Sequence, residues 1–297
     1  MATLTQNPPV EPAKQERREI SWPAIGWFGG LLILTYLPIL IALVRQWSND
    51  EDMGHGFFVP LVAGYIVWQR WDTLLKIERK PAWWGVGLLV WGTLQAYIGM
   101  LGAELFLQRS AFLISLVGML LVMGGVELVK KLLLPLMILP FMIPIPAVIY
   151  NQITFPLQLF ASQVAETVLT WIGIPVLRDG NILELASQKL SVAEACSGIR
   201  SLLTMSFLSI VYAYISDNKV WMRWALLIAT VPVAIIANAG RVTVTGILSE
   251  SDPELAQGVF HEMEGFVTFA LGFVMLILVH RIINLLWGLR KQEIAHA

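Results

Sequence analysis

The chain contains one cysteine, Cys196, in the run Glu194-Ala-Cys-Ser-Gly-Ile-Arg200. A single cysteine permits neither an intramolecular disulfide nor a cysteine metal cluster, so its chemistry is thiol chemistry or none. An isolated cysteine in a membrane protein is often an inert apolar side chain. Here the residue is predicted at the start of a helix, where free backbone N–H groups and the helix dipole stabilise a thiolate. Arg200, one turn later, adds positive charge on the same face.

Two further residues complete a set that suits acyl transfer. Arg241 follows sixteen residues without charge and is predicted to end a span on the outer side. It is a functional candidate, although an arginine at that depth can also simply snorkel to the interface. His261 is predicted to open the last span, and a solvated interfacial histidine is the alternative for it. A nucleophile, a permanent cation and a titratable base at one membrane level can form and resolve an acyl intermediate.

Other chemistries find no support in the sequence. It has no glycine-rich dinucleotide motif, no P-loop, no HExxH and no evident internal repeat, which disfavours a transporter with inverted halves. The four histidines are scattered, so we predict neither a metal nor another cofactor. A net charge of −1 excludes a strongly basic nucleic-acid binder.

Composition identifies the scaffold that must position these residues. Of 297 residues, 57% are hydrophobic and 14% charged, and the mean hydropathy is +0.69. These values predict an all-α polytopic membrane protein, whose lipids are its first partners. We expect a disordered tail over 1–20, one transmembrane domain over 21–288 and a tail over 289–297. Eight spans are predicted, at 22–44, 56–69, 83–101, 111–128, 132–150, 199–216, 221–239 and 262–283.

The distribution of basic residues predicts the orientation. With the N-terminus in the cytoplasm, fourteen of the 20 Lys and Arg residues lie on the cytoplasmic side. The positive-inside rule therefore places both termini in the cytoplasm and the ends that carry Cys196, Arg241 and His261 outside.

The segment before Cys196 is predicted to lie on the outer side as well. Residues 151–172 carry polar residues at every fourth position, which is typical of an amphipathic helix: Gln158, Ser162, Glu166 and Thr170. Short β-rich runs follow at 175–177, 182–185 and 190–192, around the turn signal Asp179-Gly-Asn181. We therefore expect an outer amphipathic helix and a small β element directly before the cysteine.

At these residues the chain resembles the exosortases, membrane cysteine enzymes related to transpeptidases and proteases. The resemblance covers nearly everything from Arg45 onward, and the Ala-Cys-Ser-Gly-Ile-Arg-Ser block is highly specific. Four other blocks carry it: Gly54-His-Gly-Phe-Phe-Val-Pro60, Met142-Ile-Pro-Ile-Pro146, Asn238-Ala-Gly-Arg241 and His261-Glu-Met-Glu-Gly265. The family's catalytic cysteine, arginine and histidine fall on Cys196, Arg241 and His261. Archaeal relatives carry arginine in the third place, so His261 implies a bacterial enzyme.

The resemblance also implies a function and a location. Its substrates are exported proteins that end in a Pro-Glu-Pro motif, a transmembrane helix and a basic cluster (PEP-CTERM proteins). The implied site is the periplasmic face of a bacterial inner membrane, with a link to exopolysaccharide production. Cys196 would be the nucleophile, His261 the general acid and base, and Arg241 the stabiliser of the oxyanion or thiolate. His55, Glu194, Arg200 and Asn238 are candidates for supporting or substrate-binding roles.

Several alternatives stay open on the sequence alone. The chain could be a non-catalytic membrane component of exopolysaccharide export, although its polar residues cluster at one face instead of lining several spans. It could also be a membrane S-acyltransferase that uses the same cysteine and histidine. Within the exosortase prediction, the acceptor is either water or an amine-bearing molecule.

Overall fold

The computed structural model describes residues 21–78, 80–192, 198–217, 219–251 and 259–296. Within these ranges, the side chains of 51–52, 198–202, 251, 259–265 and 289–296 are not described. The helices are, in chain order, α1 (Trp22–Thr35), α2 (Leu37–Asn49), the 3-10 helix η1 (Glu51–Phe57), α3 (Phe58–Gln69), α4 (Trp71–Leu74), α5 (Gly85–Leu101), α6 (Leu105–Gly124), α7 (Val126–Lys131), α8 (Leu133–Ile138), the 3-10 helix η2 (Leu139–Met142), α9 (Ala147–Trp171), α11 (Gly198–Ser216), α12 (Val220–Ser251) and α13 (Val259–His296).

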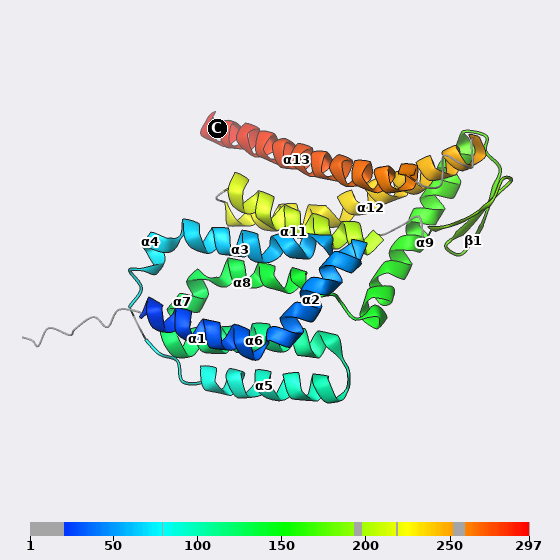
Figure 1. The fold of residues 1–297 in the computed structure, drawn as a ribbon. Coiled ribbons are helices and arrows are strands. Elements are labelled where there is room, and N and C mark those ends of the chain that lie inside the picture. The colour runs from blue at the N-terminus through cyan, green and yellow to red at the C-terminus, as the bar shows by residue number, and fades with distance from the viewer. Residues whose placement is uncertain (1–20, 79, 193–197, 218, 252–258, 297) are drawn as a thin grey trace, which may run out of the picture.

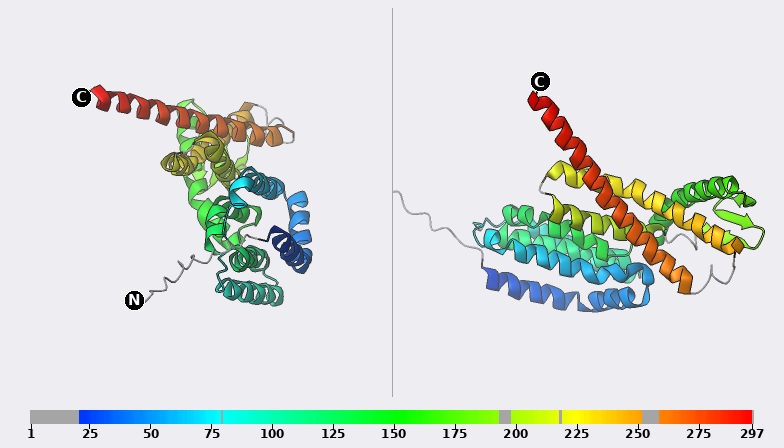
Figure 2. Two further views of the ribbon diagram at one scale, coloured as in Figure 1. Left: turned by 90° about the vertical axis from the view of Figure 1, so that its left-hand side faces the viewer. Right: turned by 90° about the horizontal axis from the view of Figure 1, so that it is seen from above.

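Most of these helices form one bundle. Helices α1, α3, α5, α6 and α11 run roughly parallel to one another, and α13 crosses α12 obliquely (Figures 1 and 2). Helix α9 and a small sheet lie together at one end of the bundle, while the start of α1 and the end of α13 lie toward the other end (Figure 1). The bundle therefore has two distinct ends, and only one of them carries the sheet.

The apolar helices agree with a membrane protein. Within the described residues, three helices are long and apolar enough to cross a membrane: Leu105–Gly124, Val220–Glu250 and Phe266–Gly288. Two sharply bent helix pairs raise this number to as many as five. Gly85–Leu101 and Leu203–Ser216 are shorter apolar helices. The count of eight spans stays a prediction.

Two of the predicted spans are not straight helices. The expected helix over 22–44 bends by 72° between α1 and α2. Pro38 stands in the first turn of α2 and has no backbone N–H to continue the hydrogen bonding of α1. At the bend, the buried Tyr36 hydroxyl lies 2.8 Å from Ser115 Oγ on α6, which holds the break against the bundle.

The span predicted over 132–150 does not form one continuous helix. The chain turns by 89° between η2 and α9, and residues 143–146 have no helical structure. Pro140, Pro144 and Pro146 explain this, because each proline removes a donor and restricts the residue before it to extended backbone. The new helix then begins at Ala147 and continues to Trp171 without a further break.

The polar stripe of α9 binds the sheet. Strands β1 (Val176–Asp179), β2 (Ile182–Leu185) and β3 (Lys189–Ser191) form an antiparallel sheet in chain order. Ser162 Oγ donates to the carbonyl oxygen of Gly180 at 3.0 Å, and Arg178 Nε donates to the Glu166 carboxylate at 2.7 Å. Asn181 Nδ2 donates to Gln158 Oε1 at 3.0 Å. The stripe therefore carries the β1–β2 hairpin instead of facing water alone.

Helices α5 and α6 meet along a seam of small residues. Gly85, Gly92 and Gly99, spaced by seven residues, are the buried residues of α5. A Cβ placed on Gly92 would lie 2.3 Å from Ser115 Oγ, and one on Gly85 would lie 2.7 Å from the carbonyl oxygen of Gly118. Small residues at such positions allow two helices in a membrane to approach closely.

We expect Gly92→Val to destabilise the protein by about 1–3 kcal/mol, because the added methyl groups force α5 away from α6. The same substitution at Gly87 is a matched control, since that glycine is exposed on the same helix and a Cβ there meets nothing within 4 Å. Thermal unfolding in detergent measures the difference. Equal melting temperatures for the two variants would contradict a tight seam.

Candidate active site

Helices α11, α12 and α13 meet at Gly272. A Cβ placed on this glycine would lie 2.9 Å from Met205 Cε on α11 and 3.6 Å from the Cβ of Ala237 on α12. The missing side chain thus allows the three helices to converge. Arg241 lies one turn beyond Ala237 on α12, in the direction of the sheet.

Arg241 is buried inside a long helix and does not end one. The helix itself does not stop where the predicted span ends at 239, because α12 continues to Ser251. Asn238, Arg241, Thr245 and Ser249 are all buried, and their spacing of three, four and four residues places them on one face. Thr245 Oγ1 donates to the carbonyl oxygen of Arg241 at 2.9 Å, which satisfies this hydroxyl within the helix.

The far end of this polar face contacts the β3 side of the sheet. Gln188 Nε2 donates to Ser249 Oγ at 2.8 Å. The Glu250 carboxylate accepts from both the backbone N–H and the hydroxyl of Ser187, at 2.9 and 3.0 Å. Hydrogen bonds therefore tie helix α12 to the connection between β2 and β3.

Cys196 and Glu194 lie outside the described residues, between β3 and α11. The described chain nearest to them is well anchored. Val192 is fully buried in one apolar cluster with Ala239 and Val242, the residues that flank Arg241 on α12 at a distance of one or two positions. Its backbone N–H donates to the carbonyl oxygen of Asn181 at 2.9 Å. The chain thus reaches α12 at the level of Arg241 four residues before Cys196.

His261 and Arg200 are placed by their backbones only. His261 lies in the first turn of α13, and Arg200 lies in the first turn of α11. Helix α12 packs against both α11 and α13. The side chains of both residues lie outside the description, so their contacts with Arg241 stay predictions.

His55 joins three elements of the fold. Its buried ring on η1 has Nε2 3.1 Å from the carbonyl oxygen of Phe141 on η2, and Nδ1 3.3 Å from Thr204 Oγ1 on α11. A carbonyl only accepts, so Nε2 carries the proton in this contact. His55 therefore links η1 to η2 and to Thr204 on α11.

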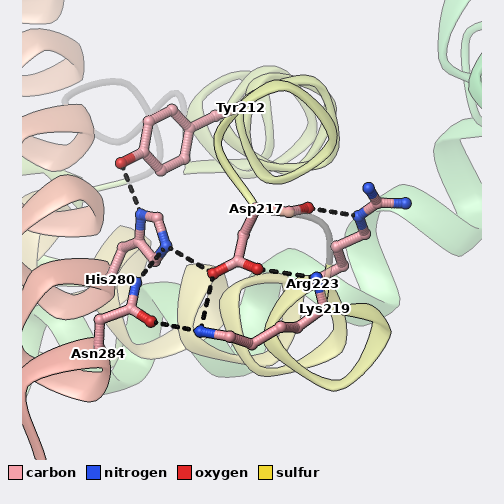
Figure 3. A network of polar contacts seen from close by, with 6 residues as sticks. All are labelled: Tyr212, Asp217, Lys219, Arg223, His280 and Asn284. Carbon is pink, nitrogen blue, oxygen red and sulfur yellow. Dashed lines mark hydrogen bonds and ion pairs between the residues drawn. The ribbon is translucent and has the colours of Figure 1, made fainter. Parts of the chain in front are cut away.

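A second polar cluster lies at the other end of α11, α12 and α13 (Figure 3). His280, buried on α13, has Nδ1 2.8 Å from the Tyr212 hydroxyl and Nε2 2.8 Å from Asn284 Nδ2. The Asp217 carboxylate lies 3.4 Å from His280 Nε2 and 3.6 Å from Lys219 Nζ, and it accepts from the Lys219 backbone N–H at 2.8 Å. The sequence analysis did not identify this cluster, although the four-residue spacing of His280 and Asn284 was a signal for it.

Hydrogen bonds keep Asp217 ionised. Burial by itself would raise the pKa of this carboxyl group, but the bonds from the Lys219 backbone and from His280 outweigh it and lower the pKa below the ordinary value of 3.8. Asp217 therefore stabilises the fold fully above pH 3.8, and this contribution disappears as the pH falls through the lower pKa of the folded state.

We expect Asp217→Asn to melt below the wild type at neutral pH and the difference to shrink when the pH falls below 3.8. Melting curves in detergent across this range measure it. Glu78→Gln is the control, because the Glu78 carboxylate is half exposed and pairs with an exposed lysine. A difference that grows toward acid pH would contradict the assignment.

The described part of the chain brings together no group of three or more His, Cys, Asp or Glu side chains that could hold a metal ion. What it does provide at the sheet-bearing end is a buried guanidinium on a polar helix face. Such a group can stabilise a developing negative charge in a site with little water.

One comparison with known proteins identifies a family. A family model described as transmembrane exosortase (Exosortase_EpsH) matches residues 47–278, which is well over half of the chain. No curated protein and no solved structure matches. The matched range includes Cys196, Arg241 and His261, and it also contains the second polar cluster except for His280 and Asn284.

Proposed function

Since this chain belongs to the transmembrane exosortase family, we propose that it is a membrane-embedded cysteine peptidase or transpeptidase that cleaves PEP-CTERM sorting signals. Cys196 is the nucleophile, His261 the general acid and base, and Arg241 the group that stabilises the oxyanion or the thiolate. The enzyme resides in a bacterial inner membrane, with both termini in the cytoplasm and the active site at the periplasmic face.

One observation carries this proposal: Val192 packs with Ala239 and Val242. These three residues share one buried cluster, so the chain that leads to Cys196 is held against the turn of α12 that bears Arg241. Only four residues separate Val192 from Cys196, and an extended chain of that length spans at most about 14 Å. This short connection supports a position of the sulfur near the guanidinium.

The length of α12 supports a site at the outer interface. Arg241 lies 21 residues after Val220, which corresponds to about 32 Å along a helix. The hydrocarbon core of a bilayer is about 30 Å thick. Trp221 and Trp224 are exposed near the start of α12, as is typical of residues at a membrane interface. If α12 enters the membrane there, Arg241 arrives at the opposite interface.

The geometry of α13 supports the role proposed for His261. His261 precedes Gly272 by eleven residues, which is close to three full turns, so both positions share one face of the helix. Gly272 marks the point where α11 and α12 approach α13. This spacing supports a position of His261 on the face of α13 that approaches the other two helices, nearer to the end that carries the sheet.

In the proposed reaction, His261 accepts the proton of the Cys196 thiol, and the sulfur attacks the carbonyl carbon of the scissile peptide bond. The oxyanion that forms is stabilised by Arg241. When the intermediate collapses, the C–N bond breaks, and the His261 imidazolium protonates the leaving amine. A thioester with Cys196 remains, and water or an amine-bearing acceptor then attacks it.

The substrate follows from the family and from the arrangement of charges. A C-terminal helix would enter the bundle laterally, with its basic cluster at the cytoplasmic face, as the positive-inside rule requires. The Pro-Glu-Pro motif before that helix would then reach the outer end. Asn238 lies on the same face of α12 as Arg241, one turn nearer the membrane centre, where it can contact this helix.

The proposal is tested by expressing the chain together with a PEP-CTERM protein that carries an N-terminal tag. Cleavage shortens the tagged substrate, and mass spectrometry of the product identifies the new C-terminus. An S-acyltransferase would instead add mass to the substrate, and a non-catalytic export component would leave it unchanged. Either of these results would contradict the proposal.

A further inference from the structure

An apolar groove of about 210 Å³ lies between α3 and α11. Leu61 and Tyr65 form one side, and Val211 and Ile215 form the other. Leu61, Tyr65 and Ile215 are at least half exposed, so the groove is open toward the outside of the bundle. In a membrane, an open apolar groove on this surface faces lipid.

Two arginines border one end of this groove. Tyr214 lines the groove, and the guanidinium carbons of Arg70 and Arg223 lie 5.1 and 5.2 Å from the centre of its ring. Arg70 Nε also donates to the Tyr214 hydroxyl at 3.0 Å. Two cations from α12 and from the residue after α3 are thus brought to the same aromatic ring.

In the described part of the chain, neither arginine is paired with an acidic side chain. Arg70 donates to the Tyr214 hydroxyl and to the carbonyl oxygen of Lys131, and Arg223 Nε donates to the backbone carbonyl of Asp217. Figure 3 shows the guanidinium of Arg223 directed away from the Asp217 carboxylate. Among the side chains that the structure describes, no carboxylate forms an ion pair with either arginine. The end of the groove therefore carries two positive charges that an anion would balance.

The depth of the arginines is that of a lipid headgroup. Trp68 and Trp71 flank Arg70 in the chain, and Trp221 and Trp224 flank Arg223; all four are exposed. Exposed tryptophans mark the membrane–water interface, where phosphate groups also lie. The apolar lining then extends from this level into the bilayer.

We propose that the groove between α3 and α11 binds an anionic phospholipid, with an acyl chain along the apolar lining and the phosphate on Arg70 and Arg223. Basic sites between transmembrane helices bind anionic headgroups in this way. The two positive charges disfavour a cationic peptide segment at the same place. This inference concerns a site separate from Cys196 and does not depend on the peptidase activity.

The test uses the full chain in detergent, titrated with phosphatidylglycerol or phosphatidylcholine of equal acyl chains and read out by native mass spectrometry. A basic residue near a membrane surface contributes roughly 1 kcal/mol, so the two arginines are expected to give about a 30-fold preference for phosphatidylglycerol. Arg70→Gln/Arg223→Gln should lose this preference. Lys76→Gln/Arg281→Gln, which removes two exposed cations elsewhere, should keep it.

A second variant tests the apolar part. Val211→Trp fills the groove without a change in charge and should weaken the binding of both lipids. The proposal fails if the wild type shows no preference for phosphatidylglycerol, or if the two double variants lose that preference equally. It also fails if Val211→Trp binds phosphatidylglycerol as tightly as the wild type. If Arg70→Gln/Arg223→Gln melts at a lower temperature yet keeps the preference, the arginines only cap helix ends, and the proposal fails.

Discussion

Cys196→Ala is expected to lower the rate of sorting-signal cleavage by about 10⁴-fold or more, because no covalent intermediate can form without the sulfur. The tagged substrate should then accumulate at full length, while the variant reaches the membrane in wild-type amount. Cys196→Ser is expected to be nearly as inactive, since an alcohol is far harder to deprotonate than a thiol. Quantitative immunoblotting of substrate and product against time measures both variants.

The single cysteine makes a second measurement possible on the same proteins. Any maleimide labelling of the wild type reports on Cys196 with no background from other thiols. A thiolate stabilised by positive charge should react well below the ordinary thiol pKa of about 8.5. Undiminished cleavage by Cys196→Ala, or labelling that rises only near that ordinary value, would contradict the assigned nucleophile.

Arg241→Gln is expected to lower the cleavage rate by about 100- to 1,000-fold, the usual effect of removing one donor to an oxyanion. Arg241→Lys should recover part of the loss, because it restores the charge but not the planar fork of donors. Arg241→Gln should also shift the pH profile of Cys196 labelling to higher pH if the guanidinium stabilises the thiolate. A merely structural role would leave that profile in place.

Thr230→Val is the control for Arg241. Thr230 is fully buried on the same helix, eleven residues earlier and thus on nearly the same face, and its hydroxyl donates to the carbonyl oxygen of Leu226 at 2.9 Å. The substitution Thr230→Val perturbs a buried position of α12 far from the end that carries the sheet. If Thr230→Val slowed cleavage as much as Arg241→Gln does, the effect would be one of helix packing and not of catalysis.

Hydropathy predicted the apolar segments but not their breaks. The hydropathy of an apolar segment is the same whether or not its helix is continuous. Hydropathy therefore does not predict the turn that the prolines between Ile138 and Ala147 produce. The extension of α12 beyond residue 239 is not predicted, for the opposite reason. Polarity rises after 239, yet the helix continues because its hydroxyl groups bond within the helix and to the sheet.

The sequence predicts the polar face of α9 but not the element that this face binds. A repeat of four identifies one helix face, but the binding of that face to Gly180 and Arg178 depends on a contact between separate elements. The same limit applies to the site. Residue types and family blocks made Arg241 a candidate, whereas predicting the buried face that it forms with Thr245 and Ser249 required knowing that α12 extends past 250.

The glycine seam of α5 and α6 also bears on how the protein is made. The two helices are joined by residues 102–104 only, so closing them costs little loop entropy. The contacts between α5 and α6 need no residue synthesised later, whereas α12 also packs against α13, which follows it in the chain. This hairpin is therefore equipped to leave the translocon already paired, as a preassembled unit against which later segments can dock.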